Sequence, residues 1–337
     1  MSNKLTTYSI KNSKGMEVVA TDFGATIVSI FVKDKTGDTK DIVLGYDTEE
    51  EYKRMDCYFG ATVGRYANRI SDAKIVIDGV EYQLEANDNE NSLHSGSKGM
   101  AGKKWDVKEV CENKITFVVK SADLEEGFPG NAVMEVTYEV TEENELVIDY
   151  RATADKKTTF NLTNHSYFNL NGHASNEVYT HMLQINASGY TPVKNEKAIP
   201  TGEIAPVEGT PFDFRKAKPI GQDIKADFDQ IKYGNGFDHN FAIDKKTDGV
   251  EQIASVYAPE SKIMMDVFTD LPGVQLYTAN FVGGQVGKGG VKYVNNGAFC
   301  LETQYFPNAI NEPNFKRPIT DVGETYQTKT IYRFSVK

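Results

Sequence analysis

The sequence predicts an all-β protein, built as one large antiparallel β-sandwich, and two observations lead to that prediction. Many short segments alternate apolar and polar residues and are separated by turn residues, which is the pattern of half-buried strands. Helical periodicity is scarce, since only residues 47–55 look like a short helix, with Asp47 as the expected N-cap. No linker-like stretch interrupts the pattern, so we expect residues 1–337 to form a single domain.

Strand and turn patterns recur along the whole chain. Asp78 and Gly79 lie between two β-rich runs in residues 74–85 and predict a two-residue hairpin turn. Residues 133–140 alternate strictly, which predicts a strand with Met134, Val136, Tyr138 and Val140 on its buried face. Further strands are expected at residues 114–120, 145–154, 181–190, 262–270, 274–281, 299–306 and 330–336.

Composition and charge limit the classes of partner. The chain is 39% hydrophobic and 25% charged, and no apolar run approaches the roughly 18 residues of a membrane span. The first residues lack the apolar region of a secretory signal, so we expect a cytoplasmic protein. A formal net charge of −11 disfavours nucleic acid and anionic membranes, because it repels phosphate groups. A neutral small ligand suits this chain better.

The cysteines, histidines and glycines give no metal or phosphate motif. Cys57, Cys111 and Cys300 are far apart, without a C-x-x-C pair, and are expected to be small buried hydrophobes rather than disulfide or zinc residues. None of the five histidines forms a close ligand pair, so no metal site is expected. The glycine-rich residues 283–290 lack the spacing and the Ser/Thr of a phosphate loop and predict a mobile loop.

One polar stretch, residues 160–172, is unusual for a core. As a strand it would place Asn161, Thr163, His165, Tyr167 and Asn169 on one face. A lone histidine in a strand is more often structural than catalytic. Burying this row dry would cost about 1–3 kcal/mol for each unpaired polar group, so the row indicates contact with water or a polar ligand.

Glu302 is a second candidate, in the core-like segment 299–306. There it shares a strand face with Cys300, Gln304 and Phe306. Glutamate is seldom fully buried without a partner. The segment alone is consistent with a solvated strand end or with a functional carboxylate.

Together these segments resemble the galactose mutarotase (aldose 1-epimerase) family over essentially the whole chain. The matching segments are residues 60–70, 93–107, 163–173, 236–241, 270–281, 300–311 and 323–336. The resemblance implies the mutarotase-like supersandwich fold and interconversion of the α and β anomers of D-galactose or D-glucose. It also implies a monosaccharide partner, no cofactor, and a monomer or homodimer.

The resemblance also implies roles for particular residues. Glu302 would be the general base on the anomeric hydroxyl, and His165 the general acid that protonates the ring oxygen. Tyr167 would shape the pocket beside His165. The residues implied to contact the sugar hydroxyls are Asn68, Arg69, His94, Asp238 and Gln275. Ring opening needs only one base and one acid, each worth typically 10²–10⁴-fold.

The candidate residues also give expectations for protonation and for two alternative functions. A glutamate near its reference pKa of about 4.3 would be ionised at neutral pH, and we expect nearby acidic charge to raise the pKa of His165 above about 6.5. A hexose-6-phosphate 1-epimerase would need extra basic residues, yet only Arg65 and Arg69 of the seven arginines accompany the motifs. A non-catalytic sugar-binding protein could dispense with Glu302 and His165, and both are present.

Overall fold

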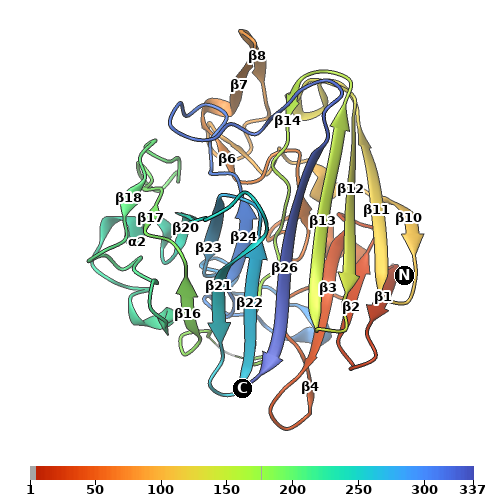
Figure 1. The fold of residues 1–337 in the computed structure, drawn as a ribbon, viewed down its shortest axis with the longest axis vertical. Helices are drawn as coiled ribbons and strands as arrows, with labels where there is room; N and C mark the ends of the chain where they lie inside the picture. The colour runs from red at the N-terminus through yellow and green to blue at the C-terminus, as the bar shows by residue number, and fades with distance from the viewer. Residues whose placement is uncertain (1–4, 176) are drawn as a thin grey trace.

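The computed structural model describes residues 5–175 and 177–337 and consists mainly of antiparallel sheets, which confirms the predicted fold class (Figure 1). The largest sheet has nine strands in the order β10 (Asp106–Val110), β11 (Lys114–Ser121), β12 (Ala132–Val140), β13 (Glu145–Ala154), β26 (Tyr326–Val336), β22 (Ile263–Thr269), β21 (Glu251–Tyr257), β16 (Met182–Ile185) and β19 (Lys218–Pro219). A four-stranded sheet contains β1 (Thr7–Lys11), β2 (Glu17–Thr21), β3 (Thr26–Lys33) and β4 (Thr39–Asp41).

A five-stranded sheet carries part of the site described below. Its order is β18 (Ala205–Pro206), β17 (Gly189–Tyr190), β20 (Asp238–Ala242), β23 (Gly273–Tyr277) and β24 (Cys300–Gln304). The two-stranded sheets pair β14 (Thr158–Thr159) with β25 (Ile319–Thr320), β15 (Thr163–Asn164) with β5 (Thr62–Val63), β6 (Arg69–Ile70) with β9 (Ser92–Leu93), and β7 (Lys74–Ile77) with β8 (Val80–Gln83). The helices are α1 (Glu49–Tyr52) and α2 (Asp229–Gly234), with single 3₁₀ turns at Ser71–Ala73, Met100–Gly102, Glu125–Gly127, Ile220–Gln222 and Lys288–Gly290.

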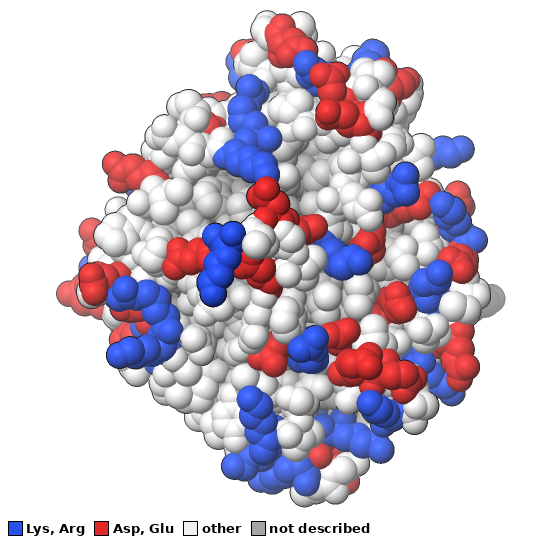
Figure 2. Space-filling model, in the orientation of Figure 1, with Lys and Arg blue, Asp and Glu red and all other residues white. Residues whose placement is uncertain are grey.

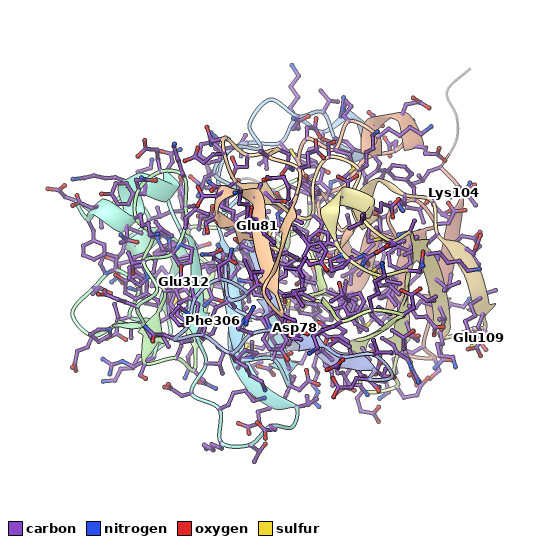
Figure 3. All side chains as sticks on the ribbon, turned by 90° about the horizontal axis from the view of Figure 1, so that it is seen from above. Asp78, Glu81, Lys104, Glu109, Phe306 and Glu312 are labelled. Carbon is purple, nitrogen blue, oxygen red and sulfur yellow. The ribbon has the colours of Figure 1, made fainter. Side chains whose placement is uncertain are left out.

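The alternation and hairpin predictions are confirmed. Along β12 every second side chain is buried, including Met134 and Tyr138, which are fully inaccessible. Asp78 and Gly79 form the two-residue turn between the paired Ile77 and Val80, with φ of 51° and 80°. Figure 3 labels Asp78 at the tip of this hairpin.

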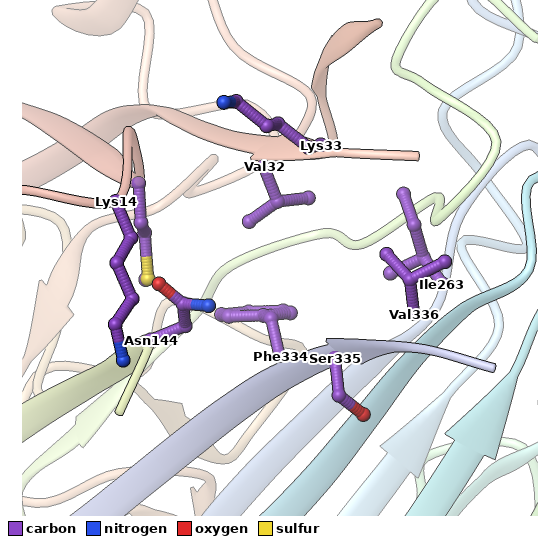
Figure 4. A pocket seen from close by; sticks show the side chains of 9 residues that line it. Lys14, Val32, Lys33, Asn144, Ile263, Phe334, Ser335 and Val336 are labelled. Atoms are coloured by element: carbon purple, nitrogen blue, oxygen red, sulfur yellow. The ribbon is translucent and has the colours of Figure 1, made fainter. Parts of the chain in front are cut away.

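The main core joins the four-stranded and nine-stranded sheets. Its buried side chains extend from Ile10 in β1 to Phe334 in β26. Between these sheets a small cavity of about 90 Å³ is lined by residues that include Val32, Asn144 and Phe334 (Figure 4). None of the predicted site residues lines this cavity, so it is not the expected pocket.

The helix predictions need two corrections. The N-cap of α1 is Thr48 rather than Asp47, because Thr48 accepts the backbone N–H of Glu51 and the Glu51 carboxylate accepts the N–H of Thr48, forming a capping box. The second helix, α2, was not predicted. It has only six residues, too few for a helical period to stand out from the surrounding pattern.

The glycine-rich segment 283–290 is anchored rather than free. The side chain of Lys288 is buried, and its Nζ donates to Asp41 Oδ2 at 2.6 Å and to the carbonyl of Val28 at 2.7 Å. This buried ion pair ties the segment to β3 and to the end of β4. The prediction of a mobile loop is therefore wrong for Lys288.

The cysteine prediction holds for two of three residues. Cys57 and Cys300 are buried, whereas Cys111, just beyond the edge strand β10, is exposed, and all three are free thiols. No helix in residues 5–175 and 177–337 is long and apolar enough to cross a membrane. Acidic and basic side chains are interspersed over the face shown in Figure 2.

Candidate active site

A cavity of about 210 Å³ brings together seven of the eight predicted site residues, Asn68, Arg69, His94, His165, Tyr167, Asp238 and Glu302. These residues come from chain segments more than 200 positions apart, and β6, β20, β24 and the loops between strands carry them. The eighth, Gln275, does not line the cavity.

Glu302 lies in the middle of β24, directly opposite Gln275 of β23. Its side chain is only 2% exposed, and among the described residues Oε2 has no hydrogen-bond partner. Burial first, and the nearby Asp238 carboxylate second, hold the pKa of Glu302 well above its usual range, against the opposing effect of Arg69. The expectation of a pKa near the reference value is therefore wrong for Glu302.

His165 follows the two-residue strand β15, and the polar stretch around it is not one regular strand. The amide of Asn161 pairs with both backbone groups of Tyr305, at 2.9 and 3.3 Å, and Asn169 donates to the carbonyl of Gly297 at 2.9 Å. The expected row of ligand-facing side chains is therefore wrong for these two asparagines, which bind backbone instead. His165 and Tyr167 alone of the five predicted side chains line the cavity.

The imidazole of His165 is buried beside the Glu302 carboxyl group. Its Nε2 lies 3.6 Å from Glu302 Oε2, longer than a hydrogen bond, and its ring stacks on Tyr167 with centroids 4.9 Å apart. Burial lowers the pKa of His165 to about 4, against the opposing effect of a hydrogen bond to its own backbone. The expected rise is therefore wrong, because loss of hydration dominates. Both shifts favour the uncharged form of each group, protonated Glu302 and neutral His165.

His94 is held as a hydrogen-bond donor toward the cavity. Its Nδ1 accepts the backbone N–H of Asn68 at 3.2 Å, so the hydrogen of the neutral ring is on Nε2. Burial, with smaller effects of His165 and Arg69, holds the pKa of His94 well below its usual range, which keeps the ring neutral.

These three side chains also form a potential metal-ligand group. His94, His165 and Glu302 each offer a ligand atom, all within 4.8 Å of one another, and two histidines with a glutamate are a known zinc donor set. The His94 ring does not fit this use. One of its nitrogens already accepts the Asn68 N–H and the other carries the hydrogen, so neither offers a free lone pair.

Arg69 and Asp238 are fixed by neighbouring side chains. Arg69 Nε donates to Asp88 Oδ2 at 2.8 Å, and its Nη1 lies 3.8 Å from Asp238 Oδ2. Gln275 Nε2 donates to Asp238 Oδ1 at 2.7 Å, while its Oε1 accepts from Gln304. Gln275, predicted as a sugar contact, therefore holds the Asp238 carboxyl group and does not itself line the cavity.

Sequence reasoning missed several residues at this site. Asp88, which holds Arg69, lies in a turn without a motif of its own. The rings of Tyr58, Tyr277 and Phe281 also line the cavity, and Phe281 is 66% exposed at its edge. Aromatic residues within the polar segments 274–281 and 57–70 were the available signal.

The arrangement suits acid–base chemistry on a neutral, hydroxyl-rich ligand. A carboxyl group and an imidazole adjoin each other, and an oxygen atom can lie within hydrogen-bond distance of both. Donors and acceptors for hydroxyl groups surround them. Among the described residues that line the cavity, Arg69 is the one Lys or Arg, against the three carboxyl side chains of Asp56, Asp238 and Glu302.

Comparisons with known proteins agree with this geometry. The family description "Aldose 1-epimerase" matches residues 6–333. Galactose mutarotase of Sus scrofa is 43% identical over 325 residues, covering 96% of this chain and 92% of that protein. Aldose 1-epimerase of Escherichia coli K12 is 37% identical over 96% of this chain and 94% of its own length. A solved aldose epimerase homologue from C. elegans superposes with a TM-score of 0.89 at 31% identity, covering 98% of this chain and 99% of the other.

Proposed function

The chain belongs to the aldose 1-epimerase family, and from that premise we propose that Glu302 and His165 open and reclose the ring of a bound aldose. The activity is that of an aldose 1-epimerase, an isomerase that interconverts α and β anomers. The observation that carries the assignment of residues is the 3.6 Å approach of the two side chains within one cavity.

The chemistry uses two neighbouring groups rather than groups on opposite sides of a bond. The anomeric hydroxyl O1 and the ring oxygen O5 are both attached to C1, so adjacent protein groups can reach both. Glu302 removes the proton of O1, the C1–O5 bond breaks, and His165 Nε2–H protonates O5. The aldehyde turns about C1–C2 and recloses as the roles reverse.

The single proton of the pair explains how both roles are available at once. The pair has two forms with the same number of protons. In one, Glu302 is protonated and His165 is neutral. In the other, Glu302 is ionised and His165 is an imidazolium. Hydrogen bonds from sugar hydroxyls stabilise the carboxylate and so favour the charged form once substrate is bound. Proton transfer within the pair then prepares the base and the acid without exchange with solvent.

The remaining side chains support a free sugar as substrate. Arg69 and the His94 N–H donate, Asp238 accepts from hydroxyl groups, and Asn68 fixes His94. The one arginine is already paired with Asp88, and carboxyl groups predominate, which disfavours a sugar phosphate. D-galactose and D-glucose are the proposed substrates. A solely sugar-binding protein gains nothing from burying the unpartnered Glu302 carboxyl group at a cost of about 1–3 kcal/mol.

We further propose that residues 1–337 act as one cytoplasmic domain, as a monomer or homodimer, without nucleic acid or membrane partners. The three free thiols fit a reducing compartment. On the face shown in Figure 2, acidic side chains are interspersed among the basic ones, which disfavours binding of phosphate groups there. Cell fractionation and sedimentation of the full chain test these statements.

Polarimetry of freshly dissolved α-D-galactose tests the catalytic assignment. Glu302→Gln and His165→Asn are each expected to lower kcat by about 10²–10⁴-fold, because each removes one proton-transfer group. Glu143→Gln, at an exposed glutamate, is the matched control and should keep wild-type turnover. Near-normal turnover in folded Glu302→Gln refutes the assignment.

A further inference from the structure

His165 is contacted at both ring nitrogens by the same strand. Cys300 and Glu302 are two positions apart in β24 and therefore point to one face of it. Glu302 Oε2 lies 3.6 Å from Nε2, and Cys300 Sγ lies 3.6 Å from Nδ1. The Cys300 side chain is fully buried, so this contact is shielded from water.

The Cys300 sulfur is a neutral hydrogen-bond partner. Burial, followed by the Glu302 and Asp238 carboxyl groups, holds the pKa of the thiol well above its usual range. The group therefore remains S–H at neutral pH and is neither a nucleophile nor a charged partner for an imidazolium. A thiol sulfur accepts hydrogen bonds weakly.

We propose that Cys300 is a positioning residue that keeps the hydrogen of His165 on Nδ1, so that Nε2 alone exchanges the catalytic proton. The inference rests on the proposed function, in which imidazolium gives its Nε2 proton to the ring oxygen. The neutral ring left behind has its hydrogen on Nδ1, donated to Cys300 Sγ. Nε2 then presents a lone pair toward Glu302, ready to receive the next proton. No bond to sulfur is made or broken.

A neutral sulfur suits this position better than a carboxylate. A carboxylate at Nδ1 would favour imidazolium and make it a weaker acid, whereas a sugar ring oxygen is a weak base that needs a strong acid. The His165 ring also meets the Glu302 carboxyl group and the backbone carbonyl of His165 itself. The remaining groups around it are the rings of Tyr58, His94, Tyr167 and Tyr277. The backbone carbonyl of His165 already accepts the N–H of Gly60 at 2.9 Å, so any hydrogen bond from Nδ1 to it would be shared with Gly60.

Kinetics of two variants measure the contribution of the sulfur. Cys300→Ala removes the acceptor and is expected to lower kcat about tenfold, the effect of one lost hydrogen bond, with the KM for galactose within about twofold. Cys300→Ser restores an acceptor and should recover most of the lost kcat. Cys57→Ala removes a buried thiol from the same apolar cluster and controls for the loss of packing, measured by urea unfolding.

Nitrogen NMR of the free enzyme gives a readout that packing alone does not move. The His165 resonances, assigned by their absence in His165→Asn, should show the hydrogen on Nδ1 in wild type and Cys300→Ser, and a mixture of tautomers in Cys300→Ala. The proposal is overturned if Cys300→Ala keeps wild-type kcat, if Nδ1 stays fully protonated without the sulfur, or if Cys300→Ser is as slow as Cys300→Ala. Failure of the acid role itself appears separately, as normal turnover in His165→Asn.

Discussion

Changing the pH from about 5 to about 7 separates two ways in which His165 obtains its proton. With a pKa of about 4, the imidazolium fraction formed from solvent would be roughly 1 in 10 at the lower pH and roughly 1 in 1,000 at the higher. A mechanism that draws on this fraction loses about 100-fold in kcat/KM across the interval. If the proton comes from Glu302 instead, kcat/KM does not depend on that fraction, and we predict a flat profile over this interval.

The sign of each limb follows from the two pKa shifts. Below about pH 4 a second proton reaches the pair, Glu302 can no longer ionise, and kcat/KM falls. As pH rises through the raised pKa of Glu302 the pair loses its one proton, and kcat/KM falls again.

Polarimetry corrected for spontaneous mutarotation in each buffer measures this profile. Glu302→Gln supplies the control, because its residual rate should lack the alkaline limb. A loss of about tenfold per pH unit between about pH 5 and 7 in wild type would refute the shared-proton reasoning.

Two further predictions concern the supports of the site and of the fold. Asp88→Asn removes the charged partner of Arg69 and should raise the KM for galactose about tenfold, with a smaller effect on kcat. Asp248→Asn, at an exposed aspartate, is the control and should change neither constant. An unchanged KM in Asp88→Asn would contradict the role of Asp88 in holding Arg69 for the sugar. Lys288→Met leaves Asp41 without its buried cation and should lower the free energy of unfolding by about 3–5 kcal/mol, measured by urea titration. Turnover at 25 °C should be retained. Equal stability of this variant and wild type would show that the ion pair does not anchor segment 283–290.

The strands of the large sheet were predictable because their own sequence decides them. The alternation along β12 and the Asp78-Gly79 turn are local signals that nothing elsewhere in the chain overrides. Helix α2 and the anchoring of Lys288 were not predictable in this way. The first is too short to show a period, and the second depends on Asp41, which is 247 positions away in the chain.

The identities of the site residues were more accessible than their electrostatics. The resemblance selected residues that the structure gathers in one cavity, Glu302 and His165 among them. The pKa of His165 was predicted to rise and that of Glu302 to stay near its reference value. Both predictions are wrong, because desolvation depends on how completely distant segments cover a side chain. The same limit applies to Gln275, because its hydrogen bonds to Asp238 and Gln304 depend on the pairing of β23 with β20 and β24.

The bond from the Asn68 amide to His94 has a consequence for which sugars can be distinguished. An imidazole that donates a hydrogen bond but cannot accept one binds an oxygen of its ligand, whether or not that oxygen carries a hydrogen. Removing the oxygen in a deoxy sugar forfeits the contact entirely. Converting it to a methyl ether keeps the contact wherever the extra carbon has room. Paired deoxy and O-methyl galactoses would therefore locate the sugar oxygen that we propose His94 contacts.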